Sequence, residues 1–327
     1  MRAFRPRPLT ERILGALPGP GLPWIVIWAA VPWLNAAANL LLDEEDRSAV
    51  WEQSDLLIVL SYASVSFAVV VTVWGGRRLA RRLGSLLAPT SELIEGDVRA
   101  AFRELNSIAG PLLATTVVSI VFGLSALIRD GALAALLRGA TWFVLGIAII
   151  TFLWTYGSLL LGLDRLGRSR LRPQSGPVDP GLGLQPLGAL AFMGLWMLLV
   201  SLVPVLLTSL PDIVGVVLGL LVLAAALATF FLALFRLHRQ MVAVKKRELE
   251  LARSLYAQAY EPVRAERTAE ALERQHHLLQ AADGLERRAR EIHEWPVDEG
   301  IITRVATIAT SVVAITVARL ILDPVGL

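Results

Sequence analysis

The chain contains no cysteine, and only two of its 31 basic residues, Lys245 and Lys246, are lysines. Without cysteine it can form no disulfide framework, no thiolate nucleophile and no cysteine-based metal site. Charged residues make up only 18% of the chain, hydrophobic residues make up 55%, and the mean hydropathy is +0.60. This composition is typical of integral membrane proteins, and the arginine bias favours a GC-rich, prokaryotic genome.

Histidine is also scarce, and it occurs only at His238, His276, His277 and His293. The sequence has no HExxH, P-loop, GxGxxG or nucleophile-elbow motif. His276 and His277 are adjacent, so on a helix they point about 100° apart. We interpret them as solvated side chains, with metal ligation as the alternative. We therefore expect no enzymatic activity, no metal and no cofactor.

Seven apolar runs approach the length of about 20 residues that a membrane-spanning helix needs. They are Leu22–Leu42, Leu56–Gly76, Ile108–Ile128, Gly139–Leu163, Pro186–Leu210, Ile213–Phe235 and a weaker run near Ile301–Leu322. The first run is too long for a cleaved signal peptide, and many spans follow it. No Asp or Glu lies in the middle of any run, which disfavours a proton- or sodium-coupled transporter.

Basic residues are distributed very unevenly between these runs. With seven spans and a cytoplasmic N-terminus, only four of the 31 basic residues fall on the outer side, namely Arg47, Arg129, Arg138 and Arg319. This asymmetry predicts a cytoplasmic N-terminus and an extracytoplasmic C-terminus. It also accounts for the basic sequence pI of 9.7 without a nucleic-acid partner. We expect a multi-pass protein of the inner cell membrane, in contact with the lipid bilayer.

Two predicted cytoplasmic stretches are more than linkers. Leu86–Leu105 predicts a short amphipathic helix at the inner membrane surface. In residues 237–298, apolar residues recur at seven-residue intervals on both sides of Pro262, which we expect to interrupt the helix. They include Val242, Leu249 and Tyr256 before Pro262, and Ala271, Leu278, Leu285 and Ile292 after it. Such heptads predict helices packed on one another, here as a long cytoplasmic hairpin between spans six and seven.

The expected organisation is therefore an all-α membrane protein with seven transmembrane helices. Residues 1–21 form a cytoplasmic N-terminal tail, and residues 22–236 form a six-helix transmembrane domain. Residues 237–298 form the cytoplasmic helical region, and residues 299–327 form the seventh helix and its tail.

The seventh run carries a polar stripe. On a helical wheel, Thr303, Thr307, Thr310, Ser311 and Ala314 share an arc of about 100°. Val317 and Ile321 continue the arc as apolar residues. Two interpretations remain open: the stripe packs closely on other helices, or it lines a water-filled path that Val317 or Ile321 closes by dewetting. The second interpretation requires a symmetric oligomer with this helix at its axis.

The entry into this run has its own pattern. We expect Pro296 to end the incoming helix, because proline cannot continue the hydrogen-bond ladder. Trp295 is then an interfacial anchor. Asp298 and Glu299 lie near the N-terminus of the new helix, where the helix dipole favours negative charge.

This layout resembles the seven-transmembrane ion-channel superfamily that contains the insect odorant and gustatory receptors. The resemblance rests on seven spans with an inward N-terminus, a helical extension below span six, and a last helix split into cytoplasmic and membrane arms. It implies a homotetramer in which the cytoplasmic extensions form an anchor and four copies of the last helix surround the pore. The stripe then becomes the pore wall, Val317 and Ile321 the gate, and Asp298 and Glu299 the inner mouth.

The same resemblance implies a small-molecule ligand in the outer half of the other spans. Residues for such a pocket are Tyr62, Phe122, Ser125 and Trp142, although aromatic residues near an interface also form lipid-facing belts. The expected function is a ligand- or stimulus-gated, poorly selective cation channel. The alternatives are a non-conducting sensor or scaffold that signals through its cytoplasmic coiled coil, and an uncoupled small-molecule carrier.

Overall fold

The computed structural model describes residues 6–42, 55–93, 98–169, 181–209, 213–266, 269–297, 300–301, 303–307, 310–311 and 314. Among these residues there are helices and no β-strand. The helices are α1 (Leu9–Ala16), α2 (Gly21–Leu42), α4 (Asp55–Leu93), α5 (Val98–Ala101), the 3₁₀ helix η1 (Arg103–Asn106), α6 (Ala109–Asp130), α7 (Ala132–Leu166), α8 (Gln185–Ser209), α9 (Ile213–Glu266) and α10 (Ala269–Glu291).

Six of these helices are long and apolar enough to cross a membrane, namely α2, α4, α6, α7, α8 and α9. They coincide with the first six predicted spans. The prediction of an all-α chain is confirmed for the described residues, and the six helices indicate a membrane protein. The predicted seventh span, near Ile301–Leu322, lies mostly outside the described residues.

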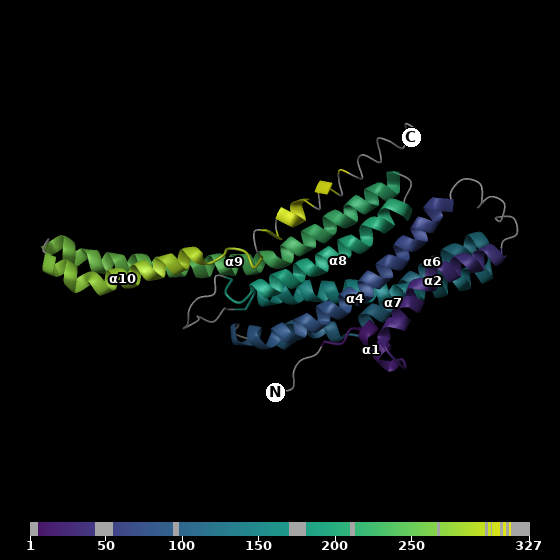
Figure 1. Cartoon of the computed structure of the whole chain (residues 1–327), viewed down its shortest axis with the longest axis horizontal. Helices are drawn as coiled ribbons and strands as arrows, with labels where there is room; N and C mark the ends of the chain where they lie inside the picture. Colours follow the sequence, from purple (N-terminus) through teal and green to yellow (C-terminus); the bar gives the residue numbers. More distant parts are fainter. Residues whose placement is uncertain are drawn as a thin grey trace.

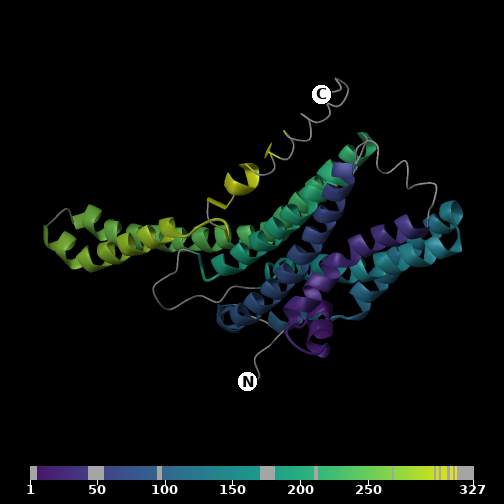
Figure 2. The same ribbon diagram turned by 45° about the vertical axis from the view of Figure 1, so that its right-hand side comes forward.

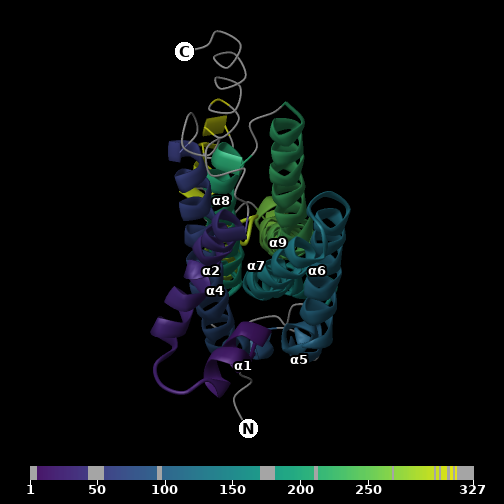
Figure 3. The ribbon, with the colours of Figure 1, turned by 90° about the vertical axis from the view of Figure 1, so that its right-hand side faces the viewer.

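Helix α7 lies at the centre of the bundle. It contacts α2, α4, α6, α8 and α9, and Figure 3 shows it between the other helices. In its spanning segment 56% of the residues are buried, against 11% for α2 and 17% for α6. Figure 2 shows α2 and the α6–α7 pair diverging from α4, α8 and α9. A hydrogen bond of 3.0 Å from the Thr141 hydroxyl of α7 to the Asn35 amide oxygen links α7 to α2.

Helices α6 and α7 form a tight pair because small residues line their contact. Gly131 connects them with φ of 88°, a left-handed conformation that favours glycine. A Cβ added to Gly123 would lie only 3.3 Å from the Ala135 carbonyl oxygen and 3.6 Å from the Gly139 Cα. The Ser119 hydroxyl donates a hydrogen bond of 2.7 Å to the Gly139 carbonyl. Such small contacts let two apolar helices pack closely inside a bilayer.

The predicted amphipathic helix over Leu86–Leu105 is wrong in its boundaries. Helix α4 continues to Leu93, and α5 and η1 supply the rest of the described segment. The reason is that Leu83 and Leu87 extend the buried face of α4 beyond its predicted end. Phe102 is then fully buried against Gly162 of α7, where any larger residue would collide with its ring.

The predicted N-terminal tail also contains ordered structure, because α1 packs beneath the bundle. Leu14 is buried, and the Glu11 carboxylate lies 2.9 Å from Nε of Arg77 and 3.5 Å from Nη2 of Arg81 on α4. Arg12 donates a hydrogen bond of 3.1 Å to the Asn106 carbonyl of η1. Helix α1 is thereby joined to two other parts of the fold.

Helix α9 is a single helix that runs from the bundle into an arm, where α10 lies beside it (Figure 1). The expected interruption at Pro262 is wrong, since α9 continues to Glu266. The two helices run in opposite directions: Tyr256 contacts Asp283 at 3.3 Å, whereas Lys245, earlier in α9, contacts Glu294, later in the chain, at 3.2 Å.

The predicted heptads supply only part of the contact between these two helices: Ile292 is buried as expected, but other buried positions lie outside the heptads. Four alanines are among the most completely buried of the described positions in the arm, and they lie seven residues apart on each helix. They are Ala252 and Ala259 on α9, and Ala282 and Ala289 on α10. Leu278, which we expected in the contact, is 40% exposed. Small residues at the contact bring the two helix axes close together, and larger apolar residues flank them.

Candidate functional site

The described part of the predicted polar stripe lies on one exposed helix face. All five residues are exposed, namely Thr303, Thr307, Thr310, Ser311 and Ala314. The Thr307 hydroxyl donates a hydrogen bond of 2.9 Å to the Thr303 carbonyl, and the Ser311 hydroxyl one of 2.8 Å to the Thr307 carbonyl. These bonds follow the helix backbone, so each hydroxyl oxygen retains acceptor capacity for water or for another polar group.

The opposite face of the same helix is held by the chain itself. Val305 is buried in the main hydrophobic core, and Ile301 packs partly against that core. The helix is therefore oriented by its apolar face, and its hydroxyl face points away from the core. The packing interpretation of the stripe, in its form with helices of the same chain, finds no support in the described residues.

An elbow of residues 292–297 connects α10 to this helix. The expectation that Pro296 ends the incoming helix is wrong, because α10 ends at Glu291. Trp295 stacks on His238 of α9, with ring centroids 4.2 Å apart and an interplanar angle of 18°. The His238 Nδ1 atom lies 2.7 Å from the Glu294 carbonyl oxygen. These contacts place Trp295 against α9. Its predicted role as an interfacial anchor stays a prediction.

The elbow also rests on α8 at a glycine. A Cβ added to Gly188 would lie 1.8 Å from the Pro296 carbonyl oxygen and 2.8 Å from Cγ1 of Val297. Val297 and Pro296 are both buried. Only glycine permits this approach of the elbow backbone to α8, so Gly188 helps to set where the last helix begins.

A polar cluster fixes the end of α7 to α9. The Asp164 carboxylate lies 3.0 Å from Nε of Arg236 and 2.9 Å from Nη2 of Arg168. The Gln240 amide donates hydrogen bonds to the carbonyls of Gly167 and Ser169, at 2.8 and 2.6 Å. It thereby satisfies carbonyls that the end of a helix leaves without intrahelical partners. In the sequence, the only sign of this cluster is that Gln240 follows Arg236 by four residues on the same helix.

The predicted ligand-pocket residues separate into two groups. Phe122 and Trp142 stack on each other, with ring centroids 4.1 Å apart, and the Ser125 hydroxyl donates a hydrogen bond to the Phe122 carbonyl. Tyr62 instead pairs with Trp33 of α2, at a centroid distance of 5.8 Å. The structure thus pairs Phe122 of α6 with Trp142 of α7, whereas Ser125 bonds to the backbone of its own helix and Tyr62 lies against α2.

Four predicted site residues lie outside the described residues: the gate residues Val317 and Ile321, and the inner-mouth residues Asp298 and Glu299. Within the described part of the chain, no group of three or more histidine, aspartate or glutamate residues could hold a metal ion.

The helices and the site together define an all-helical protein with at least six segments suited to crossing a membrane. Comparisons with protein-family models, with curated proteins and with solved structures find no match to this chain.

Proposed function

We propose that the protein is a homotetrameric, ligand- or stimulus-gated, poorly selective cation channel in the inner membrane, with its last helix lining a central pore. The observation that carries the proposal is the orientation of that helix. Its Thr307, Thr310 and Ser311 face is exposed, while Val305 on the other side is buried in the core of the same chain. In a symmetric oligomer, copies of this stripe can face one another across a water-filled central axis.

The chemistry of the stripe fits weak selectivity. Threonine and serine hydroxyls can replace part of the hydration shell of an ion, but they carry no net charge. Asp298 and Glu299, which precede the stripe in the sequence, supply the cation preference at the inner mouth. Val317 and Ile321 follow the stripe in the sequence, and they close the path when water leaves the constriction that they form.

The cytoplasmic part of the proposal is the helical hairpin. The arm of α9 and α10 is joined to the pore helix through the elbow, because Trp295 stacks on His238 and Glu294 pairs with Lys245. In a tetramer, four such arms form the anchor below the membrane. A stimulus acting on the arm then reaches the pore helix by a short chain of contacts.

A non-conducting sensor or scaffold is the second candidate. It is favoured by the exposure of Leu251 and Leu278, which are 48% and 40% exposed on the arm and can bind a partner. In that case the stripe conducts nothing. The two candidates differ in whether the stripe contacts water and whether it lies on the central axis of an oligomer.

Cysteine accessibility separates these candidates, because the native chain contains no cysteine to react in the background. We would place Thr310→Cys in the full chain in liposomes and treat it with a charged, membrane-impermeant methanethiosulfonate. The matched control is Leu113→Cys on α6, because Leu113 is 68% exposed and lies on an apolar face of the helix. We expect Thr310→Cys to react at least about tenfold faster, since a thiol ionises in water and stays neutral in hydrocarbon.

Oxidation of the same variants tests the symmetry. Four stripes around an axis bring the introduced thiols at position 310 of neighbouring copies together, so disulfide-linked dimers should form with Thr310→Cys and be absent with Leu113→Cys. Single-particle images should show fourfold particles. A monomer or twofold dimer, with position 310 as unreactive as position 113, would exclude the axial pore and leave the scaffold.

A further inference from the structure

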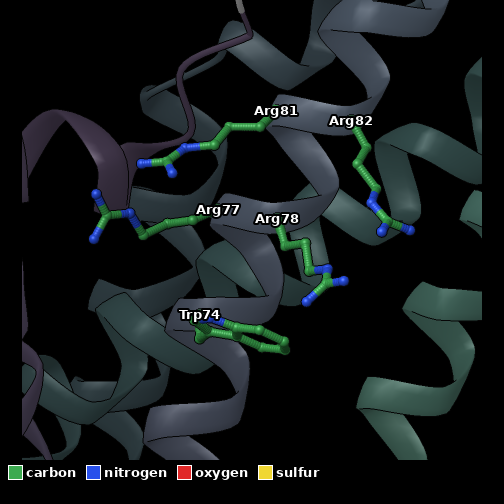
Figure 4. Close-up of a pocket in the computed structure, with 5 residues that line it drawn as sticks. All are labelled: Trp74, Arg77, Arg78, Arg81 and Arg82. Atoms are coloured by element: carbon green, nitrogen blue, oxygen red, sulfur yellow. The ribbon is translucent and has the colours of Figure 1, made fainter.

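Four arginines and one tryptophan of α4 surround an open cavity of about 370 Å³ (Figure 4). The lining residues are Trp74, Arg77, Arg78, Arg81 and Arg82. Leu79 and Ala80 lie between them in the sequence, Leu83 directly follows them, and all three are buried. Because these apolar residues fix the rotation of α4, the arginines must point outward.

The four arginines differ in how their charge is balanced. Arg77 and Arg81 point toward α1 and share the Glu11 carboxylate, at 2.9 and 3.5 Å. Arg78 and Arg82 lie on the other side of the cavity, and among the described residues neither has a carboxylate within ion-pair distance. Among the described residues, two positive charges on one side of α4 therefore have no ion-pair partner.

The contacts of these two arginines are electrically neutral and keep them in place. The Arg78 guanidinium lies 4.9 Å from the centre of the Trp74 ring. Arg82 donates a hydrogen bond of 3.6 Å to the Met193 sulfur of α8. Both side chains are thus directed by partners that leave their charge free for an anion.

The position of the cavity along α4 indicates where that anion comes from. The apolar run of α4 ends at Gly76, and Trp74 just before it is 50% exposed. Exposed tryptophans at the end of a span mark the level of the lipid headgroups. Arg78 follows Trp74 by about one helical turn and Arg82 by about two, so we expect their guanidinium groups near the level of the lipid phosphates.

We propose that Trp74, Arg78 and Arg82 bind the phosphate of an anionic phospholipid. The planar guanidinium groups present paired N–H donors that match phosphate oxygens, and the indole ring packs on the glycerol and the first acyl carbons. Arg77 and Arg81 contribute less, since both contact the Glu11 carboxylate on the α1 side. The site is independent of ion conduction.

Lipid binding to the purified full-length protein tests the site. We would titrate the protein in mild detergent with phosphatidylglycerol or with phosphatidylcholine and count bound lipids by native mass spectrometry. Each arginine near an anionic headgroup contributes about fivefold in affinity, so Arg78→Gln with Arg82→Gln should weaken phosphatidylglycerol binding about thirtyfold. The matched control is Arg287→Gln with Arg288→Gln on α10, which removes the same charge and should change nothing.

A second arm separates a lipid from a free anion. Inorganic phosphate at millimolar concentration should leave phosphatidylglycerol binding unchanged, because it lacks the apolar part that Trp74 contacts. Competition by phosphate at these arginines would overturn the lipid assignment in favour of a soluble anion. Equal binding of phosphatidylglycerol to wild type and to the Arg78/Arg82 variant would overturn the site. Should that variant fail to fold, Trp74→Ala provides the same comparison with the charges retained.

Discussion

Replacement of Gly188 by alanine should release the elbow from α8. The new Cβ would lie 1.8 Å from the Pro296 carbonyl oxygen, about 1.6 Å short of an ordinary 3.4 Å contact. Helix α8 cannot give way, because Leu187, Leu190 and Ala191 on either side of Gly188 are buried in the core. The elbow backbone must therefore move.

The expected cost follows from two estimates that agree. Overpacking of a well-filled contact costs about 1–3 kcal/mol. Release of the elbow exposes Val297, whose burial contributes about 1.5–3 kcal/mol. Gly188→Ala should thus shift the elbow toward the released state by about 2 kcal/mol, which is about thirtyfold in population.

The assay uses Val297→Cys as a reporter in a chain without other cysteines. The rate of its modification by a small thiol reagent should rise about thirtyfold when Gly188→Ala is added. The control is Gly157→Ala on α7, where an added Cβ meets no heavy atom within 4 Å. Alanine there should leave the rate unchanged. An unchanged rate with Gly188→Ala, together with an unchanged melting temperature, would refute the close contact between the elbow and α8.

Two further predictions concern the arm and the base of α9. Ala252→Leu should destabilise the α9–α10 contact by about 1–3 kcal/mol, because Ala252 is fully buried. Ala257→Leu, on the exposed side of α9, should have little effect. Equal melting temperatures of the two variants, measured by circular dichroism, would contradict this packing. Asp164→Asn should lower stability by about 1 kcal/mol through the loss of its ion pairs with Arg236 and Arg168, and the difference should shrink in high salt. Melting temperatures at low and high salt check this, and an equal difference at both would argue against the ion pairs.

The spans could be predicted because they depend on composition and length alone. Six apolar runs became six helices, and span six continues into the arm as the expected helical extension. The helix boundaries were less predictable. Pro262 was expected to break α9, but it lies close to the end of the helix, where few hydrogen bonds remain to be lost. Leu86–Leu105 was expected to be separate, but its first residues continue the buried face of α4.

The contacts that position the candidate site could not be predicted, because they join residues distant in the sequence. His238 and Glu294 are separated by 56 positions, and neither belongs to a motif. Nothing in the sequence distinguishes Gly188 from other glycines in apolar helices, because its importance depends on the contact with Pro296. The buried alanines of the arm were not predicted for a different reason: apart from Ala271, the predicted heptads consist of large apolar residues, whereas four of the most buried positions are alanines.

Helix α9 has a mechanical consequence. Between Gly219 and Pro262 it contains no glycine or proline, so nothing in its sequence introduces a hinge. With 54 residues its path is about 80 Å long, and it changes direction where it leaves the bundle for the arm (Figures 1 and 2). A tilt of one degree at its membrane end moves the far end by about 1.4 Å, and the reverse holds for a lateral push on the arm. Displacements at the arm tip are therefore reduced in amplitude and increased in force as they reach His238, as in a lever that pivots at the membrane end of α9.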